Sequence, residues 1–307
     1  MNVSFVSITT SAPGSLMLLG EHAVLEGSRA LVCAINRRIT VELRVRSDRV
    51  VKIVSALGDY VGDLDVLEDH DSFRFVLQAI RQHRNDLSYG FELHICSEFS
   101  STIGFGSSAA VTVAAHAALF GGAVDLACLF DAAFETVLCV QGRGSGADVA
   151  AAVYGGIVGY KMGEPPLLIS QSFPLTAVYC GYKKATTEVI DHVAALRLAH
   201  PEKYRALFNE MGLMVDEAIG RLNEEDLLGF GAVLNRGQVW MDALGVNTPE
   251  LEEIAEALQK NGAIFGAKIS GSGLGDCVVG VGRVECFELD APLYPLEVAL
   301  EGCRYHE

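Results

Sequence analysis

The chain has 307 residues, 50% of them hydrophobic and 20% charged, which suffices for a large core, excludes extended disorder and predicts two lobes. Its formal net charge of −16 disfavours nucleic-acid partners, and its apolar stretches fall short of the ~20 residues of a membrane span. The eight cysteines form no C-x-x-C pair, the histidines lack zinc-site spacing and the N-terminus lacks a signal peptide's basic region, which predicts a cytoplasmic enzyme.

The first half of the chain alternates predicted strands and helices. Alternating or continuous apolar segments predict strands at residues 3–10, 16–19, 30–35, 39–45, 50–54, 91–96 and 157–160. Helical spacing or small-residue runs predict helices at 71–83, 109–120 and 124–141, with a helical or turn segment at 149–154. The Gly-Glu-Pro-Pro sequence at 163–166 predicts a lobe boundary, with domains at 1–165 and 166–307.

The second half contains more predicted helices than strands. Strands are predicted at 175–182, 268–270 and 277–281, and helices at 187–198, 201–221, 225–244 and 248–261. Asn247 or Thr248 is the expected cap of the last helix, ahead of Pro249. Strands and helices alternate without a strict βαβ repeat, so the predicted fold class is α+β in two lobes.

A glycine-containing loop at residues 101–110, STIGFGSSAA, precedes a small-residue helix. Gly104 and Gly106 permit turn geometries closed to other residues and leave room for a ligand. Ser107 or Ser108 is expected to cap the helix, whose free N–H groups and dipole suit a phosphate. A flexible turn before a capped helix is the alternative interpretation of this segment.

Two further segments occur with this loop, in order: residues 11–27, SAPGSLMLLGEHAVLEG, and residues 266–277, GAKISGSGLGDC. Together the three segments resemble the three motifs of the GHMP small-molecule kinases. The resemblance covers nearly the whole chain. It implies an N-terminal lobe with a mixed sheet, a ferredoxin-like C-terminal lobe, ATP at the start of the first-lobe helix and the phosphate acceptor between the lobes.

The resemblance also implies roles for individual residues, with ATP and Mg²⁺ as cofactors and a small-molecule alcohol as the other substrate. Asp148, in a Ser-Gly-Ala-Asp turn, matches the catalytic aspartate that accepts or orients the acceptor O–H; a helix-capping aspartate is the alternative. Ser108 is also expected to bind Mg²⁺. The implied ATP-binding residues are Gly104, Phe105, Gly106, Ser107, Ser108 and Ala109, and the implied acceptor-binding residues are Glu21, His22, Ser145 and Thr186.

Several of these residues have structural alternatives. Glu21 and His22 could form a salt bridge inside the first lobe, and the glycines of residues 271–275 a tight hairpin. Lys183 or Lys184 could pair with a carboxylate or phosphate of the acceptor, or lie in a solvated turn.

Within the family, residues 20–31 and the sequence from Asn235 and Gln238 to LGVNTPEL at 244–251 resemble mevalonate kinases. This predicts ATP-dependent phosphorylation of mevalonate to 5-phosphomevalonate, in a cytoplasmic enzyme that can form a homodimer. Residues 141–155, QGRGSGADVAAAVYG, and the Gly-Asp-Cys at 275–277 favour phosphomevalonate kinase instead. Another GHMP kinase, or a catalytically weak metabolite-binding protein of this fold, is the third alternative.

Two positions depart from the family pattern. Ser15 stands where the first motif usually has a lysine that helps hold the aspartate and phosphates. Val137, eleven residues before Asp148, stands where mevalonate kinases usually have a Mg²⁺-binding glutamate. Glu135 is two positions away, about 200° around a helix, and is therefore no obvious substitute. These departures motivate the alternative of a weakly catalytic protein.

Overall fold

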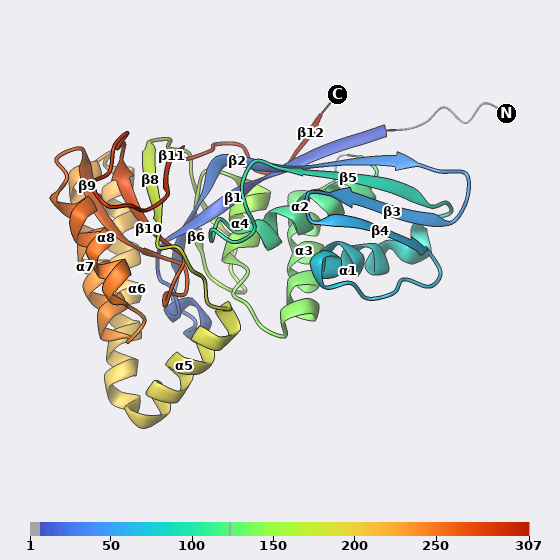
Figure 1. The fold of residues 1–307 in the computed structure, drawn as a ribbon. Helices are drawn as coiled ribbons and strands as arrows, with labels where there is room; N and C mark the ends of the chain where they lie inside the picture. The colour runs from blue at the N-terminus through green and yellow to red at the C-terminus, as the bar shows by residue number, and fades with distance from the viewer. Residues whose placement is uncertain (1–6, 123, 307) are drawn as a thin grey trace.

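A computed structural model describes residues 7–122 and 124–306. They form two lobes built on two separate β-sheets (Figure 1), which confirms the predicted two-lobed α+β class. The start of the strand predicted at 3–10 lies outside the described residues. Within the described ranges, none of the helices combines the length and hydrophobicity needed to cross a membrane.

The larger sheet has the strand order β12-β1-β2-β5-β3-β4, and β6 extends from β2 to pair with β7. Its strand pairs are antiparallel except β3 with β5. Helices α1 to α3 pack on one face, against residues such as Val41, Ile53 and Leu93. The bounds are β1 Ser7–Leu19, β2 Ala30–Val45, β3 Val50–Ser55, β4 Gly58–Asp63, β5 Phe91–Ser97, β6 Ile157–Tyr160, β7 Leu167–Ile169, β12 Arg304–His306, α1 Arg74–His83, α2 Ser107–Leu119, α3 Leu126–Gln141 and α4 Ala147–Tyr154.

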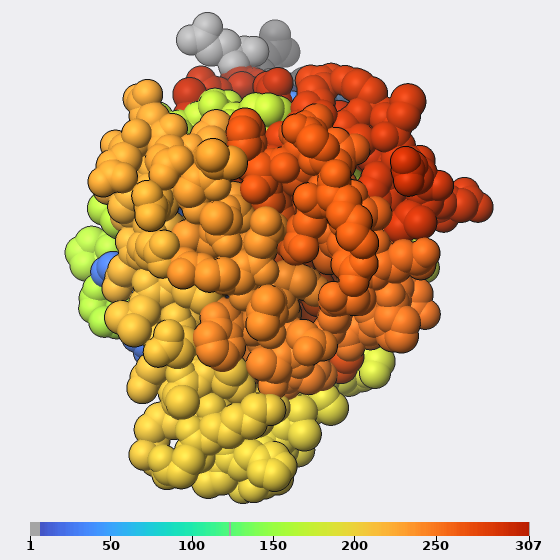
Figure 2. Space-filling model, turned by 90° about the vertical axis from the view of Figure 1, so that its left-hand side faces the viewer, coloured from blue at the N-terminus to red at the C-terminus, as the bar shows by residue number. Residues whose placement is uncertain are grey.

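The smaller sheet is antiparallel, with the order β11-β8-β10-β9. Alternate residues of a strand point to opposite faces, so Val178 and Val278 pack toward the helices while Ala177 and Val279 face the other lobe. Figure 2 shows that helices of this lobe, yellow to orange, form most of its outer surface. The bounds are β8 Pro174–Tyr179, β9 Ile264–Ser270, β10 Cys277–Gly282, β11 Leu293–Glu297, α5 Thr186–Ala199, α6 Pro201–Asn223, α7 Leu227–Ala243 and α8 Pro249–Lys260.

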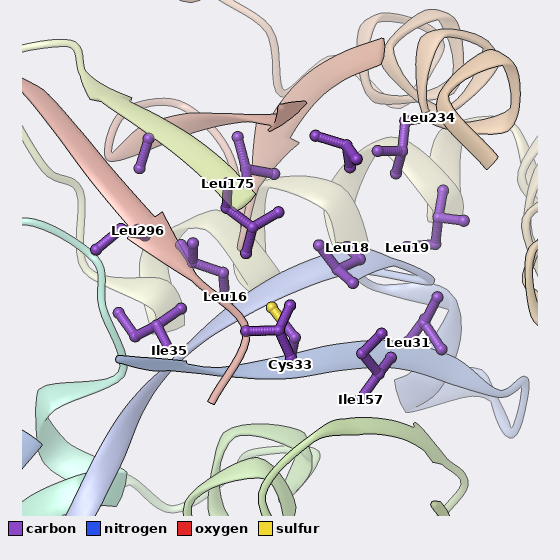
Figure 3. Packing of buried hydrophobic residues seen from close by; sticks show 14 of the residues in the cluster. Leu16, Leu18, Leu19, Leu31, Cys33, Ile35, Ile157, Leu175, Leu234 and Leu296 are labelled. Carbon is purple, nitrogen blue, oxygen red and sulfur yellow. The ribbon is translucent and has the colours of Figure 1, made fainter. Parts of the chain in front are cut away.

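A continuous hydrophobic cluster joins the two sheets. Figure 3 shows Leu16 and Leu18 of β1 and Cys33 of β2 below Leu175 of β8 and Leu296 of β11. All five side chains are at most 1% exposed. Burial of one such side chain contributes roughly 1.5–3 kcal/mol, so this cluster holds the lobes in a fixed relation. The loops that define the cleft are thereby fixed relative to one another.

The predicted break at Pro13-Gly14 is wrong, because β1 continues through it. The register with β2 shifts between Pro13, which pairs with Arg38, and Ser15, which pairs with Ala34, so the extra residues of this irregularity lie on β2. The Ser15 N–H donates to the Phe105 carbonyl (3.1 Å). The two strands predicted at 30–35 and 39–45 are likewise one strand, β2. Ser15 therefore contacts the loop before α2 directly after the register shift.

The predicted cap of α2 is also wrong. The helix begins at Ser107, and its N-cap is Gly106 in the left-handed conformation (φ 63°), without a side-chain cap hydrogen bond. By contrast, Thr248 caps α8 as expected, accepting from the Leu251 N–H at 3.4 Å. The short strands β4, β7, β11 and β12 were not predicted from the sequence. The two-domain division at residue 165/166 stays a prediction.

Candidate active site

A cavity lies where the loop before α2, the start of α4 and the glycine-rich turn between β9 and β10 meet. Its lining contains ten of the eleven sequence-predicted site residues: Glu21, His22, Gly104, Gly106, Ser107, Ser108, Ala109, Ser145, Asp148 and Thr186. The exception is Phe105, whose ring is buried against Tyr294 at a centroid distance of 5.4 Å. Residues from three distant parts of the chain are therefore brought to one cleft.

The loop before α2 is tightly enclosed on both sides. A Cβ atom on Gly106 would lie 2.0 Å from the Ser15 Oγ, and one on Gly104 would lie 2.8 Å from the Asp276 Cγ. Both glycines have positive φ, so both space and backbone conformation require glycine here. Because Ser107 and Ser108 are the first residues of α2, their N–H groups lie at the positive end of the helix, which suits a phosphate.

Asp148 lies in the first turn of α4, whose N-cap is Gly146, so the capping alternative for this aspartate is wrong. The Ser15 Oγ donates a 2.8 Å hydrogen bond to its Oδ1. Burial raises the pKa of Asp148, while this hydrogen bond and the charge of Lys183 oppose the increase. The serine at the position of the usual lysine therefore contacts the aspartate through an uncharged hydroxyl donor rather than through a cation.

Glu21 forms a buried ion pair with Lys268 of β9. The partner lies in the second lobe, so the expected salt bridge within the first lobe is not what forms. Burial lowers the pKa of Lys268, and the charge of Glu21 opposes this. Sequence reasoning missed Lys268 as a site-supporting residue, although a charged residue inside the apolar strand Ile264–Ser270 was an available signal.

His22 stands next to this pair with positive φ (59°). Its Nε2 donates to the Ser272 carbonyl at 2.8 Å, which joins the first motif to the glycine-rich turn. Burial lowers the pKa of His22, so a neutral imidazole is favoured at pH 7. Its Nδ1 is then the acceptor atom of the ring.

Asn235 and Gln238 support the site through the backbone of β9. The Asn235 Oδ1 accepts from the Ala267 N–H and the Gln238 Oε1 from the Ile269 N–H, both at 2.9 Å. These bonds flank Lys268 and fix the strand that carries it. The two side chains that resembled a mevalonate kinase motif are therefore structural in this fold.

The rim of the cavity contains Ser145 and Thr186. The Ser145 Oγ accepts from the Ala147 N–H at 3.2 Å, and Thr186 is the first residue of α5. Arg143 pairs with Asp191 at 2.6 Å and does not line the cavity. This ion pair attaches the loop before α4 to α5 and so keeps the rim in place.

Oxygen atoms suitable for Mg²⁺ bound to ATP are present in the cleft. Ser108, Asp148 and Asp276 line it, and the Asp276 Oδ1 is buried without a hydrogen-bond partner. Mg²⁺ usually takes one or two carboxylates together with phosphates and water, so these residues fit the ion. Val137 lines the cavity without a ligand atom, and Glu135 is exposed outside it. The described residues contain no group of three or more His, Cys, Asp or Glu side chains suited to a metal on its own.

The two-lobed fold and a cavity lined by both the start of α2 and the buried Asp148 define the class of protein, a small-molecule kinase. Models described as "GHMP kinases N terminal domain" and "GHMP kinases C terminal" match residues 73–156 and 217–284, and a "Galactokinase galactose-binding signature" matches residues 4–45. The mevalonate kinase of Archaeoglobus fulgidus is 34% identical over 97% of this chain and 99% of that protein. That of Aeropyrum pernix is 30% identical over 97% and 98%. The chain belongs to the GHMP kinase family.

Solved structures share the fold. A Listeria innocua protein has a TM-score of 0.86 with 21% identity, covering 98% of this chain and all of that one. The Methanococcus jannaschii mevalonate kinase has a TM-score of 0.81 with 22% identity, covering 97% and 99%. The Streptococcus pneumoniae phosphomevalonate kinase in complex with phosphomevalonate and AMPPNP has a TM-score of 0.73 with 19% identity, covering 90% and 92%.

Proposed function

We propose that this kinase transfers the γ-phosphoryl group of Mg²⁺-bound ATP to the hydroxyl of mevalonate, forming 5-phosphomevalonate and ADP. The observation that carries the proposal is that Asp148 lines one cavity together with the loop before α2 and the Glu21-His22 segment. Curated relatives named mevalonate kinase, 28–34% identical over most of the chain, support mevalonate as the acceptor.

Each group has a defined task in this reaction. The N–H groups at the start of α2 bind phosphate oxygens, and Ser108 helps to hold Mg²⁺. The acceptor oxygen attacks the γ-phosphorus as the bond to the β,γ-bridging oxygen breaks, and the acceptor proton moves to the Asp148 carboxylate. The Ser15 hydrogen bond orients that carboxylate toward the acceptor. Metal-bound ATP supplies the phosphoryl group with part of its charge neutralised.

The charge of the cleft favours mevalonate over phosphomevalonate. A phosphorylated acceptor adds about two negative charges that need cationic partners. Among the described lining residues, Lys183 is the single lysine or arginine. Arg143, the other cation expected near the acceptor, pairs with Asp191 outside the cavity. The Gly-Asp-Cys sequence that resembles phosphomevalonate kinase adds a carboxylate to the cleft, Asp276, rather than a cation.

An acceptor panel tests the proposal. The purified protein is assayed with Mg²⁺-ATP and mevalonate, phosphomevalonate, homoserine or galactose, and the products are identified by phosphorus NMR. We expect the highest kcat/KM for mevalonate. A higher kcat/KM for phosphomevalonate would assign the protein to the alternative, and no turnover with any acceptor would favour a binding protein.

The cellular setting and assembly are also proposals. We infer a cytoplasmic enzyme, in keeping with eight cysteines that form no disulfide in the described structure. Four of them are exposed rather than buried: Cys96, Cys128, Cys139 and Cys286. The homodimer stays a prediction that light scattering of the purified protein would test.

A further inference from the structure

The first motif of this chain has Ser15 in place of the usual lysine, but the cleft contains another cationic side chain. Position 15 offers only a hydroxyl, which is used in the bond to Asp148. Lys183, from the loop between β8 and α5, lines the same cavity as Gly104, Ser108 and Asp148. The cation of this cleft is therefore provided by the second lobe rather than by β1.

Backbone contacts fix the Lys183 loop against the glycine-rich turn. The Asp276 N–H donates to the Tyr182 carbonyl at 2.9 Å, and the Cys180 N–H donates to the Asp276 carbonyl at 3.0 Å. A Cβ atom on Gly275 would lie 3.0 Å from the Tyr182 carbonyl oxygen and 3.2 Å from the Lys183 Cα, so the two segments approach closely. The main chain at residue 183 is therefore held at the cleft.

The Lys183 side chain is directed by Asp276. Its Nζ lies 3.6 Å from the Asp276 Oδ1, and that carboxyl group in turn packs on Gly104 of the phosphate-binding loop. Asp276 is 7% exposed, whereas the Lys183 side chain is 35% exposed and can reach a ligand. The Lys183 charge also lowers the pKa of Asp148. The ammonium group thus lies beside a carboxylate that packs on Gly104, and its charge also acts on Asp148.

Two other cationic side chains near the cleft already form ion pairs with carboxylates. Lys268 is paired with Glu21, and Arg143 with Asp191. Lys184, the neighbour of Lys183, is exposed and does not line the cavity. An ammonium beside Asp276 also neutralises a carboxylate that would otherwise repel ATP phosphates.

We propose that Lys183 binds the γ-phosphate of ATP during transfer, and that Asp276 positions its ammonium group. Lys183 thereby supplies the positive charge that Ser15 does not. The proposal rests on the proposed function only in taking the cleft to be an ATP site. Lys183 forms no covalent bond in this role, because its N–H groups donate to phosphate oxygens as negative charge develops on them.

Turnover of matched variants gives the first test. We expect Lys183→Met to lower kcat with mevalonate by about 10²–10³-fold, the typical cost of removing a charge-stabilising donor. Lys183→Arg should retain more activity than Lys183→Met, since it keeps the charge. Lys184→Met removes the adjacent exposed charge and should leave kcat within about twofold. Equal kcat values for Lys183→Met and the wild type would overturn the proposal.

The positioning role of Asp276 is tested by a double-mutant cycle. Asp276→Asn should lower kcat when Lys183 is present and cause little further loss in the Lys183→Met background. A purely structural role, or a role of Asp276 in holding Mg²⁺ alone, would lower kcat equally in both backgrounds. Additive losses would therefore remove Asp276 from the proposal.

Nucleotide binding separates this proposal from the choice of acceptor. Calorimetry should show that Lys183→Met weakens binding of AMPPNP at least tenfold while changing ADP affinity less than threefold. If the wild type fails to phosphorylate mevalonate but this difference appears, the acceptor is wrong and the role of Lys183 stands. Equal losses for AMPPNP and ADP would contradict a γ-phosphate contact even in an active mevalonate kinase.

Discussion

At the scale of single residues, the cleft is organised around one carboxylate in a buried setting. Asp148 accepts a hydrogen bond from Ser15 of β1, and its charge raises the pKa of Asp276 and of Cys33 in addition to the effect of their burial. Burial opposes ionisation of Asp148 and raises its pKa, while the Ser15 hydrogen bond and the Lys183 charge favour ionisation. Burial likewise raises the pKa of Asp276, to about 6.

Removing the Ser15 hydroxyl should change the pH dependence of the reaction. In Ser15→Ala the Asp148 carboxylate loses a stabilising donor, so its pKa rises further. The reaction needs ionised Asp148, so the acidic limb of the kcat profile should move to higher pH. A bond to a charged group is worth about 1.5–3 kcal/mol, which corresponds to a move of the acidic limb by about one to two pH units.

The matched control for this prediction is Ser172→Ala. It removes a comparable 2.8 Å bond, to the Val298 carbonyl, outside the cavity. The profile of this control should coincide with that of the wild type. An acidic limb that stays in place in Ser15→Ala would show that the serine does not tune Asp148.

The sequence was informative about this site where chemistry is local and silent where contacts are long-range. The string Gly-Phe-Gly-Ser-Ser and the turn before Asp148 helped to predict ten residues that do line one cavity. The bond from Ser15 to Asp148 joins residues 133 positions apart, and that from Glu21 to Lys268 joins residues 247 apart. No periodicity encodes such pairs, because they depend on how the two sheets pack.

At the scale of elements, the start of α2 depends on close contact with Ser15 of β1, where the pairing of β1 with β2 shifts register. Gly106 combines positive φ with a neighbouring Ser15 side chain that leaves no room for a methyl group. Gly121, just after the same helix, also has positive φ (75°), but a Cβ atom added there would have no neighbour within 4 Å. Comparing substitutions at Gly106 and Gly121 therefore distinguishes the cost of a left-handed backbone from the effect of crowding at the site.

We expect Gly106→Ala and Gly121→Ala to share a loss of about 1–2 kcal/mol in unfolding free energy from left-handed strain. Gly106→Ala should in addition displace Ser15 from Asp148, lowering kcat at least tenfold. Urea denaturation and steady-state kinetics on both variants measure the two effects. Equal kcat values for the two variants would contradict the crowded loop geometry.

Elements were predicted well where patterns are long and poorly where they are short. Helices α6 and α8 begin at Pro201 and Pro249 as proline placement indicates. Strands β7 and β12 have three residues each, too few for an alternating pattern to be recognised. At Pro13 the sequence signal for a break was overridden by pairing with Arg38 of β2, and the register shifts only after it.

At the scale of the whole molecule, a buried ion pair and a hydrophobic cluster connect the lobes. Glu21 follows β1 and Lys268 belongs to β9, and their side chains are 2% and 1% exposed. If one member of such a pair is removed, the other remains as an unpaired charge in the protein interior. The pair therefore couples stability of the whole fold to the geometry of the cleft.

Lys268→Met should destabilise the protein by about 3–5 kcal/mol, because Glu21 would be left charged and buried. The double variant Glu21→Gln/Lys268→Met should lose less, since no unpaired charge remains. Lys260→Met breaks an exposed pair with Glu256 and should change the unfolding free energy by less than about 0.5 kcal/mol. Urea denaturation at pH 7 checks all three, and a double variant less stable than Lys268→Met would contradict the account.

The central claim is that Asp148 acts on the acceptor hydroxyl in an ATP-dependent transfer. Asp148→Asn keeps the size of the side chain but cannot take the proton. It should lower kcat with mevalonate by about 10²–10⁴-fold, or ~3–5 kcal/mol of transition-state stabilisation. The most direct measurement is single-turnover phosphoryl transfer in this variant, combined with calorimetric titration of AMPPNP. The account predicts slow transfer with nearly unchanged nucleotide affinity, whereas transfer at the wild-type rate would contradict it.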